Sequence, residues 1–159
     1  MSDFVSPIQF DNSYLASIEF DLSEGLKHFK APPNLGDLSH SLEVSHARNY
    51  EETEGKIGCW CDLAVRWSVE ALDDEKEYSS LFHAKAEIAG WARCPIANYE
   101  TEEVQEVLAA SNIGFLWATL RDHFDSLTGA SAIGRIQLPA ISPYALLEKN
   151  EGEGDPGSE

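Results

Sequence analysis

Residues 56–70 constrain the fold more than any other segment, because apolar and polar positions alternate along their whole length. One set of alternate positions is apolar throughout and comprises Ile57, Cys59, Cys61, Leu63, Val65, Trp67 and Val69. The other set is mostly small, polar or charged and comprises Gly58, Trp60, Asp62, Ala64, Arg66, Ser68 and Glu70. A period of two over this length predicts a long β-strand with one buried face and one face largely in water.

Three other segments have the pattern of strands, residues 13–21, 42–50 and 79–91. Ile18, Phe20 and Leu22 alternate cleanly in and just beyond the first of them. The apolar face of the last one comprises Phe82, Ala84, Ala86 and Ile88. Between the first two strands, residues 31–36 read Ala-Pro-Pro-Asn-Leu-Gly, so residues 23–39 predict a long irregular connection. Such a connection is long for a hairpin, and we expect it to cross the sheet or to serve a function.

The spacing of apolar residues changes from strand to helix after residue 100. Thr101 is a suitable N-cap for a first helix, with Glu102 and Glu103 in the first turn. A second, longer helix is predicted to begin at Ser111 or Asn112 and to end at Gly129. Its apolar positions at helical spacing are Ile113, Leu116, Trp117, Leu120, Phe124 and Leu127, of which Trp117 is expected in the core. Residues 144–149 predict a last helical turn.

Four strands followed by helices predict an α+β fold. The expected architecture is a four-stranded antiparallel sheet with a long crossover loop, followed by two helices packed on one face. The 159 residues fit one domain, residues 1–149, followed by a disordered acidic tail in residues 150–159. Two helices cover only part of such a sheet, so apolar surface should remain for a partner chain or a client.

The charge of the chain narrows the range of partners. The net charge is −17, from 28 acidic against 11 basic residues, which argues against binding nucleic acid or anionic membranes. The first residues lack the basic segment and apolar run of a signal peptide. An odd number of cysteines, three, does not suggest a disulfide framework. We therefore expect a cytoplasmic protein.

The candidates for chemistry each have an ordinary interpretation. Cys59, Cys61 and Cys94 could supply thiolates to a soft metal, but on an apolar strand face they are better read as small hydrophobic residues. His40 and His46 with Glu43 could form an acid–base cluster, but solvated or interface histidines are favoured. No catalytic motif occurs in the sequence. We expect no enzyme, no cofactor and no metal site.

Trp60 has a less ordinary position, because it lies on the polar face of its strand. A tryptophan that points away from the core often marks an oligomer interface. Coverage by the connection in residues 23–39 is the alternative, and both remain open at this point.

The order of these segments, and several residues in them, resemble the SecB and SecB-like chaperone family. Residues 17–21 resemble the first strand of the family, and residues 22–39 its long crossover loop. Residues 112–117, Asn-Ile-Gly-Phe-Leu-Trp, resemble the start of its second helix. Residues 136–142, Ile-Gln-Leu-Pro-Ala-Ile-Ser, with Ala145 and Leu146, resemble the extended segment that follows. The acidic, glycine-rich end of the chain also matches.

The resemblance implies an ATP-independent holdase that captures unfolded polypeptides in long apolar grooves and assembles as a homotetramer, a dimer of dimers. It implies a role in protein export and transport, or in protecting an antitoxin. The candidate client-binding residues are Leu26, Phe29, Leu35, Leu42 and Val44. Asp21 matches an acid with which the family docks a SecA-type ATPase, whereas Ser17 stands where a second acid would be. The alternative is an oligomeric small-molecule-binding or subunit-interaction protein without client activity, which would enclose a compact pocket instead of an open groove.

Overall fold

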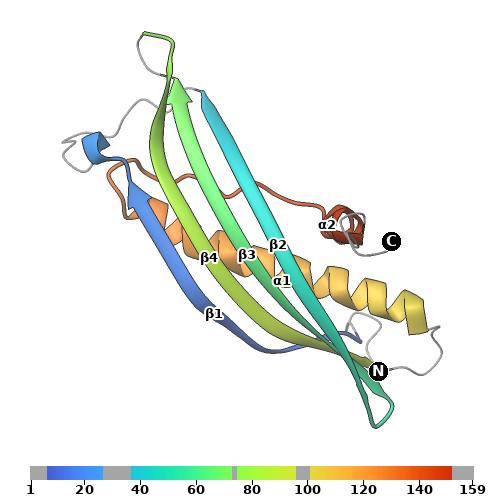
Figure 1. The fold of residues 1–159 in the computed structure, drawn as a ribbon. Helices are drawn as coiled ribbons and strands as arrows, with labels where there is room; N and C mark the ends of the chain where they lie inside the picture. Colours follow the sequence, from blue (N-terminus) through green and yellow to red (C-terminus); the bar gives the residue numbers. More distant parts are fainter. Residues whose placement is uncertain (1–6, 27–36, 73–74, 96–100, 152–159) are drawn as a thin grey trace, which may run out of the picture.

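The computed structural model describes residues 7–26, 37–72, 75–95 and 101–151. It contains one antiparallel sheet in the strand order β1-β4-β3-β2, with two helices behind it (Figure 1). The strands are β1 (Gln9–Leu22), β2 (Leu38–Thr53), β3 (Lys56–Leu72) and β4 (Tyr78–Pro95). A short 3-10 turn, η1 (Glu24–Leu26), follows β1, and the helices are α1 (Thr101–Gly129) and α2 (Pro143–Glu151). Since β1 and β2 form opposite edges of the sheet, the connection between them joins one edge to the other, and its residues 27–36 lie outside the described residues.

The predicted faces of the two central strands are confirmed. None of the seven apolar positions of β3 is more than 2% exposed. The four apolar positions predicted on β4 are at most 3% exposed. Trp67 packs edge-on against Phe82 of β4 and Phe124 of α1, with ring centroids 4.8 and 5.4 Å apart. These aromatic contacts join the sheet to the helix.

The first strand departs from simple alternation at two places. Its pairing with β4 shifts between Asp11 and Tyr14, and again between Leu15 and Ser17. Asn12 has a φ of 50°, a left-handed conformation that asparagine tolerates better than most residues. The shifts are bulges, and each changes which face the following side chains occupy. Leu15 and Ile18 can therefore both pack against the core, although they are three positions apart and would lie on opposite faces of a regular strand.

The helical region is one continuous helix, α1, so the predicted break at Ser111 or Asn112 is wrong. The reason lies in the side chain of Asn112, which is 1% exposed. Its amide nitrogen donates to the carbonyl oxygens of Cys59 and Gly90, at 3.1 and 3.0 Å, and does not cap a helix. Gly90 permits this close contact, because a Cβ there would lie 3.2 Å from Leu116 Cδ2.

The segment after α1 folds back along it and leads into α2. Trp117 Nε1 donates to the carbonyl oxygen of Pro139 at 2.9 Å, and Arg121 Nε donates to that of Leu138 at 2.9 Å. Trp117 is 4% exposed, which confirms its place in the core. The predicted last turn is a nine-residue helix, α2, anchored by Leu147 at 3% exposure.

The two faces of the sheet differ in how they are covered. The inner face packs against α1, which lies behind β3 and β4 (Figure 1). The inner faces of the edge strands are only partly buried, for example at Ile18, Leu42 and Val44. No described helix or strand packs on the outer face. Among the described helices, none is long and apolar enough to cross a membrane.

We predict that Asn112→Ala lowers the free energy of unfolding by about 1–3 kcal/mol. The substitution removes two hydrogen bonds from a site that water does not reach, and it leaves a small cavity. Urea denaturation measures the change. Asn49→Ala, at an exposed position of β2, is the matched control and should change stability by less than about 0.5 kcal/mol. Equal stability of the Asn112 variant and the wild type would contradict the role given to this amide.

Candidate functional site

The inner face of β2 is the first candidate surface, and we call it the β2 flank. It presents His40, Leu42, Val44 and His46, which share a face because they alternate along the strand. Leu42 and Val44 are half-buried and pack against the edge of the core. They are not fully covered because α1 lies over β3 and β4. The β2 flank therefore extends the apolar core toward the surface.

The predicted client-binding residues occupy three kinds of position. Leu42 and Val44 lie on the β2 flank. Leu26 ends the turn η1 and is buried in the core, with 7% of its surface exposed. Phe29 and Leu35 lie outside the described residues. Client binding by all five remains a prediction.

The two histidines of the β2 flank differ in exposure, because His40 is exposed and His46 is half-buried. His40 Nδ1 accepts a hydrogen bond of 3.1 Å from Trp67 Nε1, which requires that nitrogen to be unprotonated. Burial lowers the pKa of His40 below its usual 6.5. Both ring nitrogens of His46 are buried and make no hydrogen bond to a described residue. Both rings are therefore uncharged at neutral pH.

The pKa of His46 reflects its position on β2 beside α2. Burial is the main cause that lowers this pKa below 6.5, and the charge of Arg48 acts in the same direction. The backbone of Leu146 in α2 and the charge of Asp62 oppose the shift. Protonating His46 would place a positive charge in a partly buried site, where the Leu146 backbone and Asp62 offset only part of the cost of burial.

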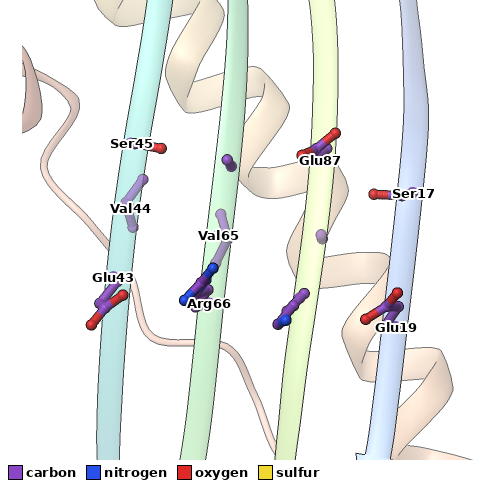
Figure 2. A pocket seen from close by; sticks show the side chains of 11 residues that line it. Ser17, Glu19, Glu43, Val44, Ser45, Val65, Arg66 and Glu87 are labelled. Carbon is purple, nitrogen blue, oxygen red and sulfur yellow. The ribbon is translucent and has the colours of Figure 1, made fainter.

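The outer face is the second candidate surface, and its side chains form rows across the strands. In one row, Glu43 of β2, Arg66 of β3, Lys85 of β4 and Glu19 of β1 stand directly opposite one another. Figure 2 shows the side chains of Glu43, Arg66 and Glu19 in line, with the next row beside them. These rows line an open hollow of about 500 Å³, which we call the central hollow. Its walls are charged or polar, so it does not resemble an apolar client groove.

The predicted docking residue, Asp21, is exposed on this face. It stands opposite His83 of β4, which in turn stands opposite Ser68 of β3. Ser68 Oγ lies 2.8 Å from His83 Nδ1, a hydroxyl–imidazole contact that the sequence did not indicate. The contact is exposed to water, and the backbone N–H groups of these central strands pair within the sheet. Docking by Asp21 remains a prediction.

Trp60 lies on the outer face in a cluster of aromatic side chains. Its ring centroid is 5.9 Å from that of Tyr14 on β1 and 5.5 Å from that of Trp91 on β4. Trp60 is partly exposed, and Tyr14 is 52% exposed. No described helix or strand covers them, and residues 27–36 of the crossover lie outside the described residues. An oligomer interface at Trp60 therefore remains a prediction.

The three cysteines are buried free thiols. Cys59 Sγ and Cys61 Sγ are 3.5 Å apart on the inner face of β3. Contact with Cys61 and burial both raise the pKa of Cys59, and burial raises the pKa of Cys94. No group of three or more metal-ligating side chains occurs in the part of the chain that the structure describes. The thiols therefore pack as small apolar groups.

The comparisons with known proteins bear on the fold. The sequence matches no family model and no curated protein. The solved structure of the Mycobacterium tuberculosis Rv1957 SecB-like chaperone, in complex with a ChAD peptide from the Rv1956 HigA1 antitoxin, is similar with a TM-score of 0.57. The match has 18% identity and covers 85% of this chain and 91% of that chain. The chain has a SecB-like fold.

A second solved structure is similar at a lower level. A protein of unknown function from Streptococcus agalactiae aligns with a TM-score of 0.46 and 10% identity, over 84% of this chain and 97% of that chain. At 18% identity, the similarity to the mycobacterial protein is a similarity of fold.

We predict that the SecB-like fold loses stability as the pH falls below about 6.5, partly because of His46. A lowered pKa means that the unfolded chain binds more protons than the folded chain just below the usual value of 6.5. Stability therefore rises with pH through this window and falls on acidification.

The test compares thermal midpoints at about pH 7.5 and about pH 5.5. His46→Gln should reduce the fall, whereas His123→Gln, at an exposed position on α1, should not. An identical fall in both variants would show that His46 does not contribute.

Proposed function

We propose that this protein is an ATP-independent chaperone of the SecB-like kind, a holdase that binds unfolded polypeptides through apolar side chains. The observation that carries the proposal is the SecB-like fold together with a β2 flank that is apolar and only half-buried. The solved structure with this fold is that of a chaperone holding a peptide of an antitoxin. Binding an apolar segment needs no catalytic group, and the proposed activity involves no cofactor.

The β2 flank suits this activity for a physical reason. A client side chain placed on Leu42 and Val44 would bury apolar surface that the fold leaves open, worth about 25 cal/mol per Å² before the costs of association. Contacts of this kind do not depend on the client's sequence, so one surface can serve many clients. We propose that Phe29 and Leu35 of the crossover, which lie outside the described residues, also contact the client.

The surrounding surfaces fit an oligomer. On α1, Val107, Phe115 and Leu127 are 44%, 37% and 36% exposed, although large apolar side chains usually lie inside. Phe115 stacks on Phe10 of the edge strand β1, with ring centroids 4.4 Å apart. We propose that copies of the chain meet around Phe115 and Phe10 and form a homotetramer, a dimer of dimers.

The cellular role proposed is capture of clients in the cytoplasm, for export or for protection of an antitoxin. Asp21 is the candidate contact with a SecA-type ATPase. The alternative, a small-molecule binder, would use the apolar hollow formed by Ile8, Cys94, Val104, Val107 and Leu108. At about 230 Å³ this hollow is smaller than the usual range of ligand pockets, about 300–1,000 Å³. We therefore favour the chaperone over a small-molecule binder that uses this apolar hollow.

We predict that the wild-type protein suppresses aggregation of several unrelated denatured proteins, and that Leu42→Ser with Val44→Ser weakens this suppression. The two hydroxyls lower the apolar area available to a client. Light scattering of the client measures the effect, and circular dichroism checks the fold. Ala47→Ser, on the opposite face of β2, is the control. A wild type without effect on any client would remove the chaperone proposal, whereas an unaffected double variant would move the groove elsewhere.

We also predict a tetramer in solution, which Phe115→Glu should dissociate. A carboxylate at this position would need to be desolvated in the interface without a partner. Light scattering coupled to size exclusion measures the particle mass. His123→Glu adds the same acid at an exposed position of α1 and should leave the assembly intact. A wild-type monomer at micromolar concentration would contradict this prediction.

A further inference from the structure

Two acids on the outer face, Asp62 and Glu87, have no basic residue opposite them. Asp62 of β3 stands between Ala47 and Ala89 on the neighbouring strands. Glu87 of β4 stands between Ala64 and Ser17. No ion pair joins either acid to a base in the described part of the chain.

The bases of the same face are matched to other acids. Arg66 stands opposite Glu43, and Lys85 stands opposite Glu19. Arg93 pairs with Asp11, with 3.4 Å between Nε and Oδ2. The negative charge of Asp62 and Glu87 is thus not directly offset by these bases.

The two acids share a hollow with two aromatic rings, which we call the Trp60 hollow. Its walls include Tyr14, Trp60, Asp62 and Glu87, and none of the described residues that line it is basic. The small side chains of Ala16, Ala64 and Ala89 line its floor and leave space above them, and its volume is about 330 Å³. The Tyr14 and Trp60 rings are tilted by 43° to each other and are both accessible from solvent.

The contacts of Arg93 show that an aromatic ring and a carboxylate on this face can hold one cation together. The guanidinium carbon of Arg93 lies over the Trp91 ring, 6.0 Å from its centroid, while the same side chain pairs with Asp11. One cation there satisfies an aromatic face and a carboxylate together. The Trp60 hollow offers the same two kinds of group, but no cation from the described part of the chain lines it.

We propose that the Trp60 hollow is a binding site for an organic cation, a guanidinium or primary ammonium group, held between the rings of Tyr14 and Trp60 and the carboxylates of Asp62 and Glu87. The cation comes either from a free small amine or from an arginine or lysine side chain of a polypeptide. The site is separate from the β2 flank, which lies on the other face of the sheet, and does not depend on the chaperone proposal.

The test uses the full chain and two probes at physiological ionic strength. Agmatine represents a free cation, and a short glycine–serine peptide with one central arginine represents a side chain. The same peptide with a central glutamate is the negative probe. Binding is followed by calorimetry and by shifts of the Trp60 indole signal in NMR spectra, assigned with Trp60→Phe.

At least one cationic probe should bind to the wild type, and Asp62→Asn with Glu87→Gln should weaken that binding about fivefold or more. Trp60→Leu should weaken it as well. The matched control is Glu70→Gln with Asp122→Asn, which removes the same charge from exposed positions elsewhere and should stay within about twofold of the wild type.

The outcomes separate the sources of the cation and can reject the site. Binding of agmatine alone assigns a free amine, and binding of the arginine peptide alone assigns a polypeptide side chain. Absence of binding by both cationic probes overturns the proposal. Equal weakening in the control pair also overturns it, because the attraction would then come from the overall charge of −17 and not from this hollow.

Discussion

Burial of the inner faces of β3 and β4 under α1 is the constraint on which the rest of the structure depends. Trp67 locks into this layer through edge-on contacts with Phe82 and Phe124. Asn112 ties the middle of the helix to the carbonyls of Cys59 and Gly90. A single helix so placed cannot also cover β1 and β2, which flank this pair in the sheet. The edge strands are half-buried and the outer face is uncovered because the one long helix packs on the inner face of β3 and β4.

Local periodicity was enough to predict the central strands but not the details of β1 and α1. The alternation in residues 56–70 is a property of neighbouring residues, so it gave the correct face at each apolar position. The bulges of β1 depend on its pairing with β4, and no alternation rule contains that pairing. Asn112 has the side chain of a helix cap, and only its two carbonyl partners on the sheet explain why it lies inside a helix.

The candidate sites show the same limit. Trp60 and Asp62 could be placed on one polar face from the sequence, because they alternate on one strand. Tyr14 and Glu87 join them only through the register of β1 and β4, and Tyr14 reaches the outer face only because of the bulge at Asn12. His40 is exposed, as expected for a solvated or interface histidine, but the sequence does not show that its ring lies against Trp67.

In the row that crosses the middle of the outer face, the two bases lie on the central strands and the two acids lie on the edge strands. Arg66 and Lys85 stand directly opposite each other, which is unfavourable in a sheet, while their acids Glu43 and Glu19 lie on the edge strands. The cost is small because all four side chains are exposed to water. Each central base has an acid of its own row opposite it, whereas the carboxylates of Asp62 and Glu87 have no base opposite them in the sheet. The two neighbouring hollows therefore differ in charge, although Ala64 and Glu87 line both.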